Sequence, residues 1–356
     1  MNMMKDMLRP NVRLLDVPDA VDLARIEAFV AGHPDATIFH RPGWLQAVAQ
    51  GCGQIGCWLL AERGGALNGL LPLTLVHSAI FGRALVSCGF AVGGGILSED
   101  DATAALLAEH AVMLATRRSC PTIELRGGAM PALQWTVRED QYAGFVRALG
   151  LDEEAELLTI PRKQRAEIRK AMTSGLRVTI GQGEQDRRAH YAVYAESVRN
   201  LGTPVFPQSL FDAVLDRFGE DADILTVWQA DTPVASVLSL YHGGSVMPYW
   251  GGGTRAARQL RANEWMYFSL MSHARNREAT QFDFGRSKIG TGAFAYKKNW
   301  GFAPVPLRYA TYHAQGSTPR DINPLNPKYR AQIALWQRLP LAVANRLGPI
   351  IARGLG

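Results

Sequence analysis

The sequence predicts an α/β protein built from two similar domains in tandem, each a mixed sheet flanked by helices. The chain has 356 residues, 47% apolar and 20% charged, a globular balance that excludes disordered, collagen-like and coiled-coil proteins. A hairpin, a triple glycine, an amphipathic helix and a short apolar strand follow one another twice. Gly93 and Gly127 are 34 positions apart, and so are Gly251 and Gly285. A duplicated α/β unit accounts for this repeat.

Each half is expected to begin its repeat with paired strands. Cys57–Val76 has the pattern of strand, turn and strand, with a Gly-Gly pair at the turn. Ile224–Gly253 has the pattern of three strands, with turns at residues 230–232 and 243–244. An uncharged run from Gly64 to Gly82 approaches the length of a membrane span, but Pro72 and its polar residues favour two buried strands.

Three segments have helical signals. Arg162–Ser174 is closed by Gly175, and Gln208–Phe218 is closed by Gly219. Ala256–Arg277 follows the second triple glycine and has a plausible buried stripe of apolar residues. From these elements we expect a first domain over residues 1–155, a second over 156–315 and a basic tail over 316–356.

Charge and cysteine content restrict the class of protein only mildly. The net charge of +6 makes an anionic partner plausible without selecting one. No cysteine pair has zinc or redox spacing, so neither a metal site nor a disulfide framework is expected, and a reducing compartment fits best. The N-terminal residues contain no apolar stretch typical of a signal peptide, so we expect a cytoplasmic protein. The cysteines are Cys52, Cys57, Cys88 and Cys120.

Several common catalytic motifs are missing from the chain. It contains no P-loop, no G-x-G-x-x-G after a strand, no H-E-x-x-H and no G-x-S-x-G. The sequence therefore lacks the motifs that usually identify P-loop nucleotide hydrolases, dinucleotide-binding proteins, zinc proteases and serine hydrolases.

The first positive signal is the basic helix at residues 162–171. Three of its arginines share one face, where unpaired guanidinium groups suit a phosphate, a pyrophosphate or an RNA backbone. On another face Glu167 can pair with Lys163 and Lys170. A solvated charged helix is the alternative reading. The three arginines are Arg162, Arg165 and Arg169.

The second signal is the segment Phe282–Phe302. Asp283 lies on the face of a short strand opposite the flanking phenylalanines, and Gly285 ends that strand. Polar residues and cations then follow on a glycine-rich loop, which suits an anionic ligand or a developing oxyanion, although a basic surface loop has the same pattern. They are Arg286, Ser287, Lys288, Lys297 and Lys298.

Neighbouring segments supply further candidates for substrate binding. Tyr249 and Trp250 near the end of the preceding strand could form an aromatic wall, or could belong to the core. Asn263 and Glu264 lie in the following helix and are weaker candidates.

The order of these motifs resembles FemAB-type transferases. The basic helix is followed by A-N-E-W at 262–265, F-D-F-G-R-S at 282–287 and K-K-N-W-G at 297–301, and F-H-R-P-G-W stands upstream at 39–44. More narrowly, the chain is similar to FemAB-related proteins associated with bacterial exosortase and PEP-CTERM exopolysaccharide systems. The resemblance covers roughly residues 35 to 310.

The resemblance implies two GNAT-like domains and transfer of an acyl or aminoacyl group to an amine. Acyl-CoA and aminoacyl-tRNA are the donors that it allows. It also implies that Lys297 lies near the reacting carbonyl, with Trp300 where the family more often has Phe. The long helical hairpin that some members use for tRNA has no place here, and the GNAT pyrophosphate loop is absent after Gly253, so donor identity stays open.

The C-terminal residues 330–356 contain four arginines and no acidic residue. The arginines recur every seven or eight positions, opposite Leu335, Trp336 and Leu339, which is the pattern of an interfacial helix. The alternative is a tail packed back over the first domain. The first reading predicts peripheral contact with the inner membrane.

Together these observations predict an N-acyltransferase acting on an amine of a cell-envelope or exopolysaccharide precursor. We expect Lys297, with Arg286, to stabilise the tetrahedral oxyanion and Asp283 to orient the amine or accept its proton. Arg165 and Arg169 would hold phosphates. A non-catalytic module binding a nucleotide- or lipid-linked saccharide and an RNA-binding protein remain the alternatives, and the sequence leaves the oligomeric state open.

Overall fold

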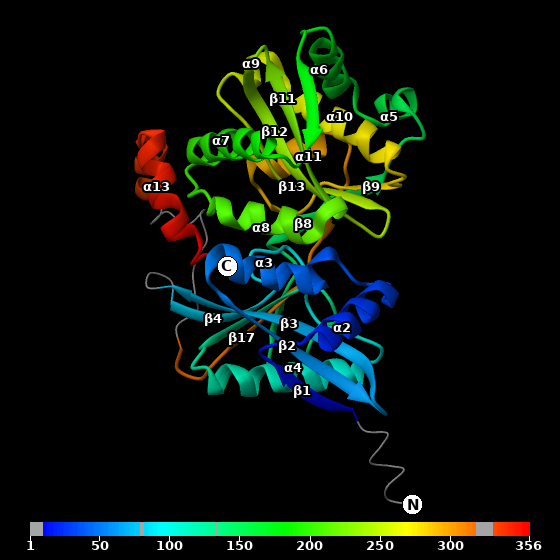
Figure 1. Cartoon of the computed structure of the whole chain (residues 1–356), viewed down its shortest axis with the longest axis vertical. Helices are drawn as coiled ribbons and strands as arrows, with labels where there is room; N and C mark the ends of the chain where they lie inside the picture. The colour runs from blue at the N-terminus through cyan, green and yellow to red at the C-terminus, as the bar shows by residue number, and fades with distance from the viewer. Residues whose placement is uncertain (1–9, 79–81, 133, 318–329) are drawn as a thin grey trace, which may run out of the picture. The chain divides into compact units, whose positions relative to one another are not determined.

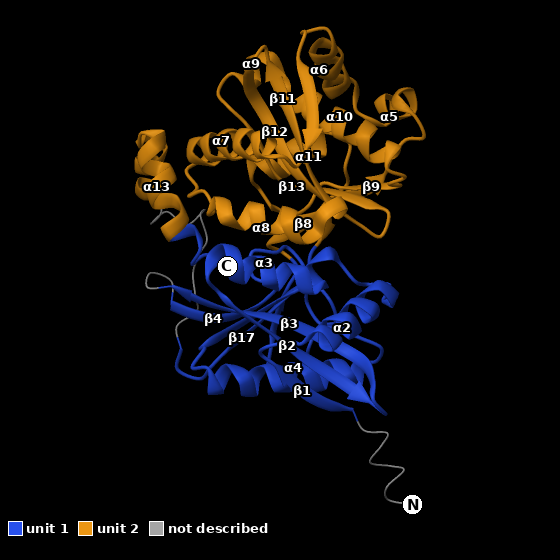
Figure 2. Ribbon diagram, in the orientation of Figure 1, with its two compact units in different colours: residues 1–139, 307–323, 351–356 blue, residues 140–306, 324–350 orange. Residues whose placement is uncertain are grey.

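The computed structural model describes residues 10–78, 82–132, 134–317 and 330–356. Contacts divide the chain into two units, which Figure 2 shows in different colours. Unit 1 comprises residues 1–139, 307–323 and 351–356, and unit 2 comprises residues 140–306 and 324–350.

Unit 1 is built on a sheet with the strand order β1-β2-β3-β4-β6-β17-β7, with β5 paired to β3 (Figure 1). Its strands are β1 (Asn11–Leu15), β2 (Ile55–Arg63), β3 (Ala66–Ser78), β4 (Gly82–Ser87), β5 (Leu97–Ser98), β6 (Thr122–Arg126), β7 (Thr136–Arg138) and β17 (Tyr309–His313). Its helices are α2 (Ala20–Gly32), η1 (Ile38–His40), α3 (Pro42–Cys52) and α4 (Asp101–Arg117). Alternate residues along β2 and β3 enter two cores, one with α4 and one with α2 and α3, so helices cover both faces of the sheet.

Unit 2 is built on a sheet with the strand order β10-β11-β12-β13-β14-β9, and a small sheet has the order β15-β8-β16. The strands are β8 (Tyr142–Gly144), β9 (Val146–Ala148), β10 (Arg177–Gly181), β11 (Ala222–Gln229), β12 (Thr232–His242), β13 (Ser245–Gly253), β14 (Gln281–Asp283), β15 (Ser287–Lys288) and β16 (Val305–Pro306). The helices are α5 (Glu153–Thr159), α6 (Arg162–Met172), α7 (Glu184–Leu201), α8 (Gln208–Phe218), η2 (Gly219–Asp221), α9 (Ala257–Leu260), α10 (Ala262–Asn276), α11 (Gly292–Asn299), α12 (Arg330–Arg338) and α13 (Leu341–Ala352).

The two large sheets confirm the predicted duplication. The order β1-β2-β3-β4-β6-β17 matches β10-β11-β12-β13-β14-β9 position by position. In both sheets every neighbouring pair is antiparallel except the fourth with the fifth, β4 with β6 and β13 with β14, which are parallel. Hairpins, helix and strand thus recur in the order that the sequence indicates.

The sixth strand in the order of each sheet, β17 in unit 1 and β9 in unit 2, comes from outside the repeat that forms the rest of that sheet. β17 follows unit 2 along the chain yet pairs with β6, whereas β9 precedes most of unit 2 and pairs with β14. Because β9 pairs within unit 2, the boundary between the units lies after residue 139 and not at the expected residue 155. Residue 155 lies inside helix α5. Residues 142–148 belong to unit 2 because they form β8 and β9 in its sheets.

Most of the local expectations are confirmed. The turns lie where expected, and the uncharged run contributes strand β3 rather than a helix. The helix expected over 256–277 is divided into α9 and α10 because Arg261 between them adopts φ +56, a left-handed conformation that interrupts a helix. Among the described residues no helix combines the length and apolarity needed to cross a membrane.

The expected tail is divided between two sets of contacts, and residues 318–329 of it lie outside the described residues. Helix α12 packs on α7, where Gln337 Nε2 donates to Asn200 O at 3.2 Å. The last residues 351–356 contact unit 1, since Gln54 Nε2 donates to Arg353 O at 2.7 Å and Arg126 Nη2 to Gly356 O at 2.8 Å. This end of the tail therefore packs back onto the first domain.

Candidate functional site

Strands β13 and β14 run in parallel but pair only at their first two positions, Ser245 with Gln281 and Val246 with Phe282. Beyond them β13 continues through residues 247–253 with β12 on one side. Within the described ranges, no strand pairs with the other edge of residues 247–253. The two strands thus diverge, and ligands in α/β sheets bind where the carboxyl ends of neighbouring strands separate.

The triple glycine at the end of β13 allows side chains of the helices to approach its backbone closely. A Cβ added at Gly251 would lie 3.3 Å from Tyr267 Oη and 2.9 Å from Val237 Cγ2. A Cβ at Gly253 would lie 2.7 Å from Asn263 Oδ1. Asn263 and Tyr267 come from α10 and occupy the same helical face, four residues apart. The structure therefore brings Asn263, a predicted site residue, against the end of β13.

Tyr267 extends from β13 to the segment that follows β14. Its ring lies 4.7 Å from the Phe284 ring and 6.1 Å from the Tyr296 ring. Burial, and secondarily the Glu264 carboxylate one turn earlier, raises the pKa of Tyr267. The hydroxyl is therefore protonated at neutral pH. We did not predict Tyr267 or Tyr296 as site residues, although Tyr267 follows the A-N-E-W motif at helical spacing.

Lys297 and Asp283 meet around the loop that leaves β14. Lys297 Nζ donates to Gly285 O at 3.1 Å and to Arg286 O at 2.9 Å. Asp283 Oδ1 accepts a hydrogen bond from Gly285 N at 2.8 Å. Two of the three ammonium protons of Lys297 are thereby used to hold this loop, and one remains for a ligand.

Burial shifts the acid-base properties of both groups. It lowers the pKa of Lys297 to about 8, with Asp283 opposing and Arg286 adding to this shift. Burial raises the pKa of Asp283, while the Gly285 N–H and Lys297 oppose the rise. Shifted pKa values of this kind are common where a site exchanges protons.

The other cations of the glycine-rich segment spread in two directions. The Arg286 guanidinium lies 4.5 Å and Lys288 Nζ 5.9 Å from the ring centre of Tyr142 in β8. Lys298 is exposed on α11, with Nζ 5.9 Å from the Phe294 ring. Ser287 is buried in β15, and its Oγ has no hydrogen-bond partner in the described part of the chain.

Of the two places that the sequence allows for Trp250, an aromatic wall or the core, the structure shows the core. Trp250 is buried, and its ring lies 4.7 Å from that of Phe211 in α8, so it belongs to the core under the helical layer of α7 and α8. The reason is a β-bulge. Leu238 pairs with Trp250 and Ser239 with Pro248, which leaves Tyr249 as the extra residue of β13.

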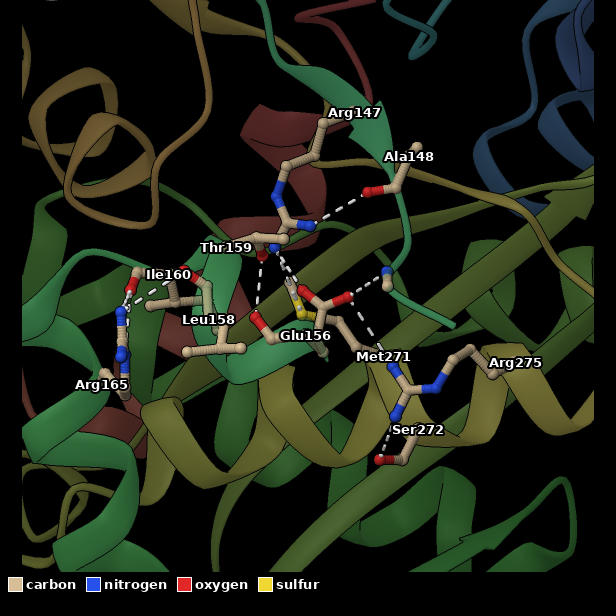
Figure 3. A network of polar contacts seen from close by, with 11 residues as sticks. Arg147, Ala148, Glu156, Leu158, Thr159, Ile160, Arg165, Met271, Ser272 and Arg275 are labelled. Atoms are coloured by element: carbon tan, nitrogen blue, oxygen red, sulfur yellow. Dashed lines mark hydrogen bonds and ion pairs between the residues drawn. The ribbon is translucent and has the colours of Figure 1, made fainter. Parts of the chain in front are cut away.

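The predicted arginine row is also incomplete, because the side chain of Arg165 is bound within the protein (Figure 3). Arg165 Nη2 donates to Ile160 O at 3.0 Å and to Leu158 O at 3.3 Å, so this guanidinium caps the end of α5. Arg162 and Arg169 are exposed, and with the described residues they form no hydrogen bond or ion pair through their side chains. Two cations of α6 thus remain available to an anionic ligand. Glu167 pairs with Lys170 and Arg261.

A buried carboxylate that we did not predict anchors this region. Glu156 in α5 is fully buried and accepts hydrogen bonds from Arg147 and, at 2.7 Å, from Gly150 N (Figure 3). Arg275 Nη1 from α10 lies 3.7 Å from the same carboxylate. The network ties α5 to β9 and α10 and thereby positions the start of α6.

The described residues contain no cluster of His, Cys, Asp and Glu that could hold a metal ion. All four cysteines are buried and free. The groups available for chemistry at the carboxyl ends of β13 and β14 are a lysine, a carboxylate and tyrosine hydroxyls.

Comparison with known proteins identifies the fold. The acetyltransferase (GNAT) domain family matches residues 162–298, which lie in unit 2. No curated protein matches the chain by sequence.

Among solved structures, FemX has a TM-score of 0.66 at 14% identity, with 90% of this chain and 99% of FemX covered. A tandem GNAT protein from the clavulanic acid biosynthesis pathway, solved without AcCoA, has a TM-score of 0.54 at 14% identity, with 86% of this chain and 100% of that one covered. The C-terminal domain of a putative lysylphosphatidylglycerol synthetase from Agrobacterium fabrum has a TM-score of 0.55 at 12% identity, with 83% and 93% covered. The chain therefore has the tandem GNAT fold, and residues 162–298 within its second half are similar to the acetyltransferase (GNAT) domain family.

Proposed function

We propose that this protein is an N-acyltransferase that moves an acyl or aminoacyl group from an activated donor to an amine. The observation that carries the proposal is the divergence of β13 and β14 beside Tyr267, Lys297 and Asp283. The GNAT domain match over the same residues supports it.

Acyl-CoA is the donor that the open strand edge favours. Residues 247–253 offer backbone N–H and C=O groups on an edge that no described strand occupies. An extended ligand with amide groups can pair with such an edge as an added strand would, and the pantetheine arm of CoA has two amides. Arg162 and Arg169 supply cations for phosphate groups. The same arginines suit the phosphates of aminoacyl-tRNA, which is the alternative donor.

The groups at the site allow a balanced reaction. The acceptor nitrogen attacks the donor carbonyl, and the Asp283 carboxylate, whose pKa is raised, takes the proton that the nitrogen loses. The remaining N–H of Lys297 stabilises the oxyanion together with Arg286. As the bond from carbonyl carbon to sulfur breaks, the thiolate receives a proton from Tyr267, and solvent exchange restores both residues.

The acceptor that we propose is an amine of a cell-envelope or exopolysaccharide precursor. This assignment depends on the resemblance to FemAB-type and exosortase-associated proteins. The reaction would take place in the cytoplasm, where both candidate donors are made. Tyr249, Ser287 and Lys298 are the remaining candidates for contact with the acceptor or donor.

The decisive experiment is a donor screen by isothermal titration and thermal unfolding. Acetyl-CoA, longer acyl-CoAs and charged tRNA are each titrated into the full chain. We expect saturable binding of an acyl-CoA, weakened at least about tenfold in Gly251→Val because the added side chain enters the space beside Tyr267. Gly93→Ala is the matched control, since its Cβ would meet Phe39 at an ordinary 3.6 Å.

Each other outcome points to a different function. Binding of charged tRNA alone would make the protein an aminoacyltransferase, and RNA binding with a steep salt dependence but no turnover would indicate an RNA-binding protein. If every donor fails to bind the folded protein, the proposal is wrong and a non-catalytic saccharide-binding module becomes the better reading. Tyr267→Phe tests the chemistry separately, because it keeps the ring and removes only the hydroxyl.

A further inference from the structure

Helix α13 has two faces of different character. Ala344, Gly348 and Ala352 recur every four residues and are buried. A Cβ added at Gly348 would lie 3.0 Å from Val205, so the helix packs closely against the chain that follows α7. Small side chains on this face account for the close approach, which holds α13 in one orientation.

The opposite face of α13 exposes apolar side chains. Val343, Leu347 and Ile350 are 41%, 43% and 58% exposed. Their spacing of four and three residues places them on one stripe of the helix. Arg346, also exposed, lies along one edge of this stripe, and the exposed Arg353 directly follows the last residue of the helix. Aliphatic side chains turned to solvent in a continuous row are unusual unless something covers them.

Helix α12 repeats this arrangement. The side chain of Ile333 in α12 packs against Gly202, so closely that a Cβ added at Gly202 would clash with it. Leu335 is 65% exposed, and Arg338 is exposed one turn from it. Two consecutive helices thus each bury one face on the protein and present an aliphatic side chain beside an arginine.

The arginines of these helices have no acidic partner among the described residues. Residues 330–356 contain four arginines and no acidic residue. None of the four arginine side chains forms an ion pair with any residue of the described ranges. Exposed arginines in other places do find carboxylates, as Arg188 does with Glu184 and Arg118 with Asp16. Exposed apolar side chains next to arginines without an ion-pair partner among the described residues are complementary to one kind of surface. That surface has anionic groups on the outside and an apolar layer directly beneath them.

We propose that the outer face of α12 and α13 docks on an anionic lipid bilayer. The apolar side chains enter the boundary between headgroups and acyl chains, and the arginines contact lipid phosphates. The helices lie in the surface and do not span it, because α13 has only 12 residues. This inference does not depend on the proposed transferase activity.

Vesicle flotation with the full chain tests the proposal. The probes are vesicles of phosphatidylcholine alone and of phosphatidylcholine mixed with phosphatidylglycerol. We expect binding to the anionic vesicles that weakens with added salt and is at least about tenfold stronger than to neutral ones. The triple variant V343S, L347S and I350S should lose at least about tenfold in partition coefficient, because these exposed side chains provide the apolar contact. The triple variant R338Q, R346Q and R353Q should lose about fivefold per arginine.

Matched controls separate this surface from general stickiness. Val17→Ser with Leu151→Ser removes apolar side chains that are 86% and 96% exposed outside the segment, and Arg188→Gln with Arg255→Gln removes charge outside it. Both should bind as the wild type does, and circular dichroism verifies that each variant is folded. Absence of binding to anionic vesicles, or equal binding by the apolar variant, overturns the proposal. A dimer in light scattering that the apolar variant abolishes would also overturn it, since the stripe would then be covered by a second copy.

Discussion

The two sheets of this protein share their topology but differ in what occupies the opening between their parallel strands. β4 and β6 pair only at Leu85 with Ile123 and Val86 with Glu124, just as β13 and β14 pair at only two positions. Both sheets therefore diverge at the same place in the fold, and the residues that lie at the two openings differ.

In unit 1 the chain itself fills the opening. Residues 88–96 leave β4 and are held by side chains from several elements. Gly89 N donates to Thr74 Oγ1 at 2.9 Å, and Trp44 Nε1 donates to Gly89 O at 3.0 Å. Arg126 Nη1 donates to Ala91 O at 2.6 Å, and His40 Nε2 contacts Gly95 O at 3.0 Å. The first triple glycine lies in this filling segment.

In unit 2 the equivalent residues remain in the strand. Gly251 and its two neighbours end β13, and the loop that Lys297 and Asp283 organise belongs to the other strand. Duplication has thus preserved the divergent sheet in both halves, while in the second half no described strand pairs with the edge of β13 at residues 247–253. The comparison predicts that substitutions in the first half affect stability and that those in the second affect activity.

Lys297→Met should have the largest effect on activity. It removes the ammonium that holds Gly285 and Arg286 and faces the proposed oxyanion, so kcat/KM should fall by about 10²–10³. Steady-state kinetics with the donor that the titration screen identifies measures the change, and Lys298→Met on the exposed face of α11 is the matched control. An unchanged kcat/KM in Lys297→Met would remove this residue from the site.

Arg126→Met makes the corresponding change in unit 1 and should reduce stability instead. The Arg126 guanidinium is buried and bonds to Glu124, to Ala91 O and to Gly356 O, all of which lose a partner. We expect a loss of about 2–4 kcal/mol in the free energy of unfolding, measured by urea denaturation. The specific activity of the folded fraction should stay near that of the wild type. A variant that is stable but inactive would show that the first half also takes part in the reaction.

The pH dependence of kcat/KM tests the assigned roles of Asp283 and Lys297, and the expected changes in rate are smaller than those of the substitutions above. Because burial raises the pKa of Asp283, the rate should fall at acidic pH from a point above the ordinary range for Asp, as the base becomes protonated. Because burial lowers the pKa of Lys297 to about 8, the rate should also fall about tenfold per pH unit above that value, as its charge is lost. Lys297→Arg should shift the alkaline limb to higher pH, and a wild-type profile flat from neutral to pH 10 would contradict this assignment.

The hairpins, the helices and the repeat could be predicted because each depends on residues near in sequence. Glycine pairs mark turns, and Gly219 marks the end of α8, which has the expected bounds Gln208–Phe218. The grouping of Asp283, Gly285 and Lys297 could be anticipated for the same reason, since a single strand, loop and helix carry them.

Other features of the site depend on partners far away in the chain. Arg165 is spaced along α6 as one of three arginines on a single face, which predicts a ligand-binding row. Its guanidinium instead donates to the Ile160 carbonyl at the end of α5. Trp250 was a candidate for an aromatic wall at the site. The β-bulge in β13 instead directs its side chain toward Phe211. Tyr267 could not be predicted as a site residue, because its hydroxyl reaches the site only through the separation of β13 and β14.

Sequence periodicity and glycine placement by themselves determined that the protein is a duplicated α/β chain with a basic, glycine-rich segment after its last apolar strand. Tertiary structure alone decided that β9 pairs with β14 and β17 with β6. It also decided that residues 88–96 lie beside β4, that no described strand pairs with residues 247–253 of β13, and that the side chains of Val343, Leu347 and Ile350 are exposed. The reason is that local propensity acts within a few residues, whereas the partner of a strand edge, a guanidinium or a helix face is chosen by whichever distant segment packs there.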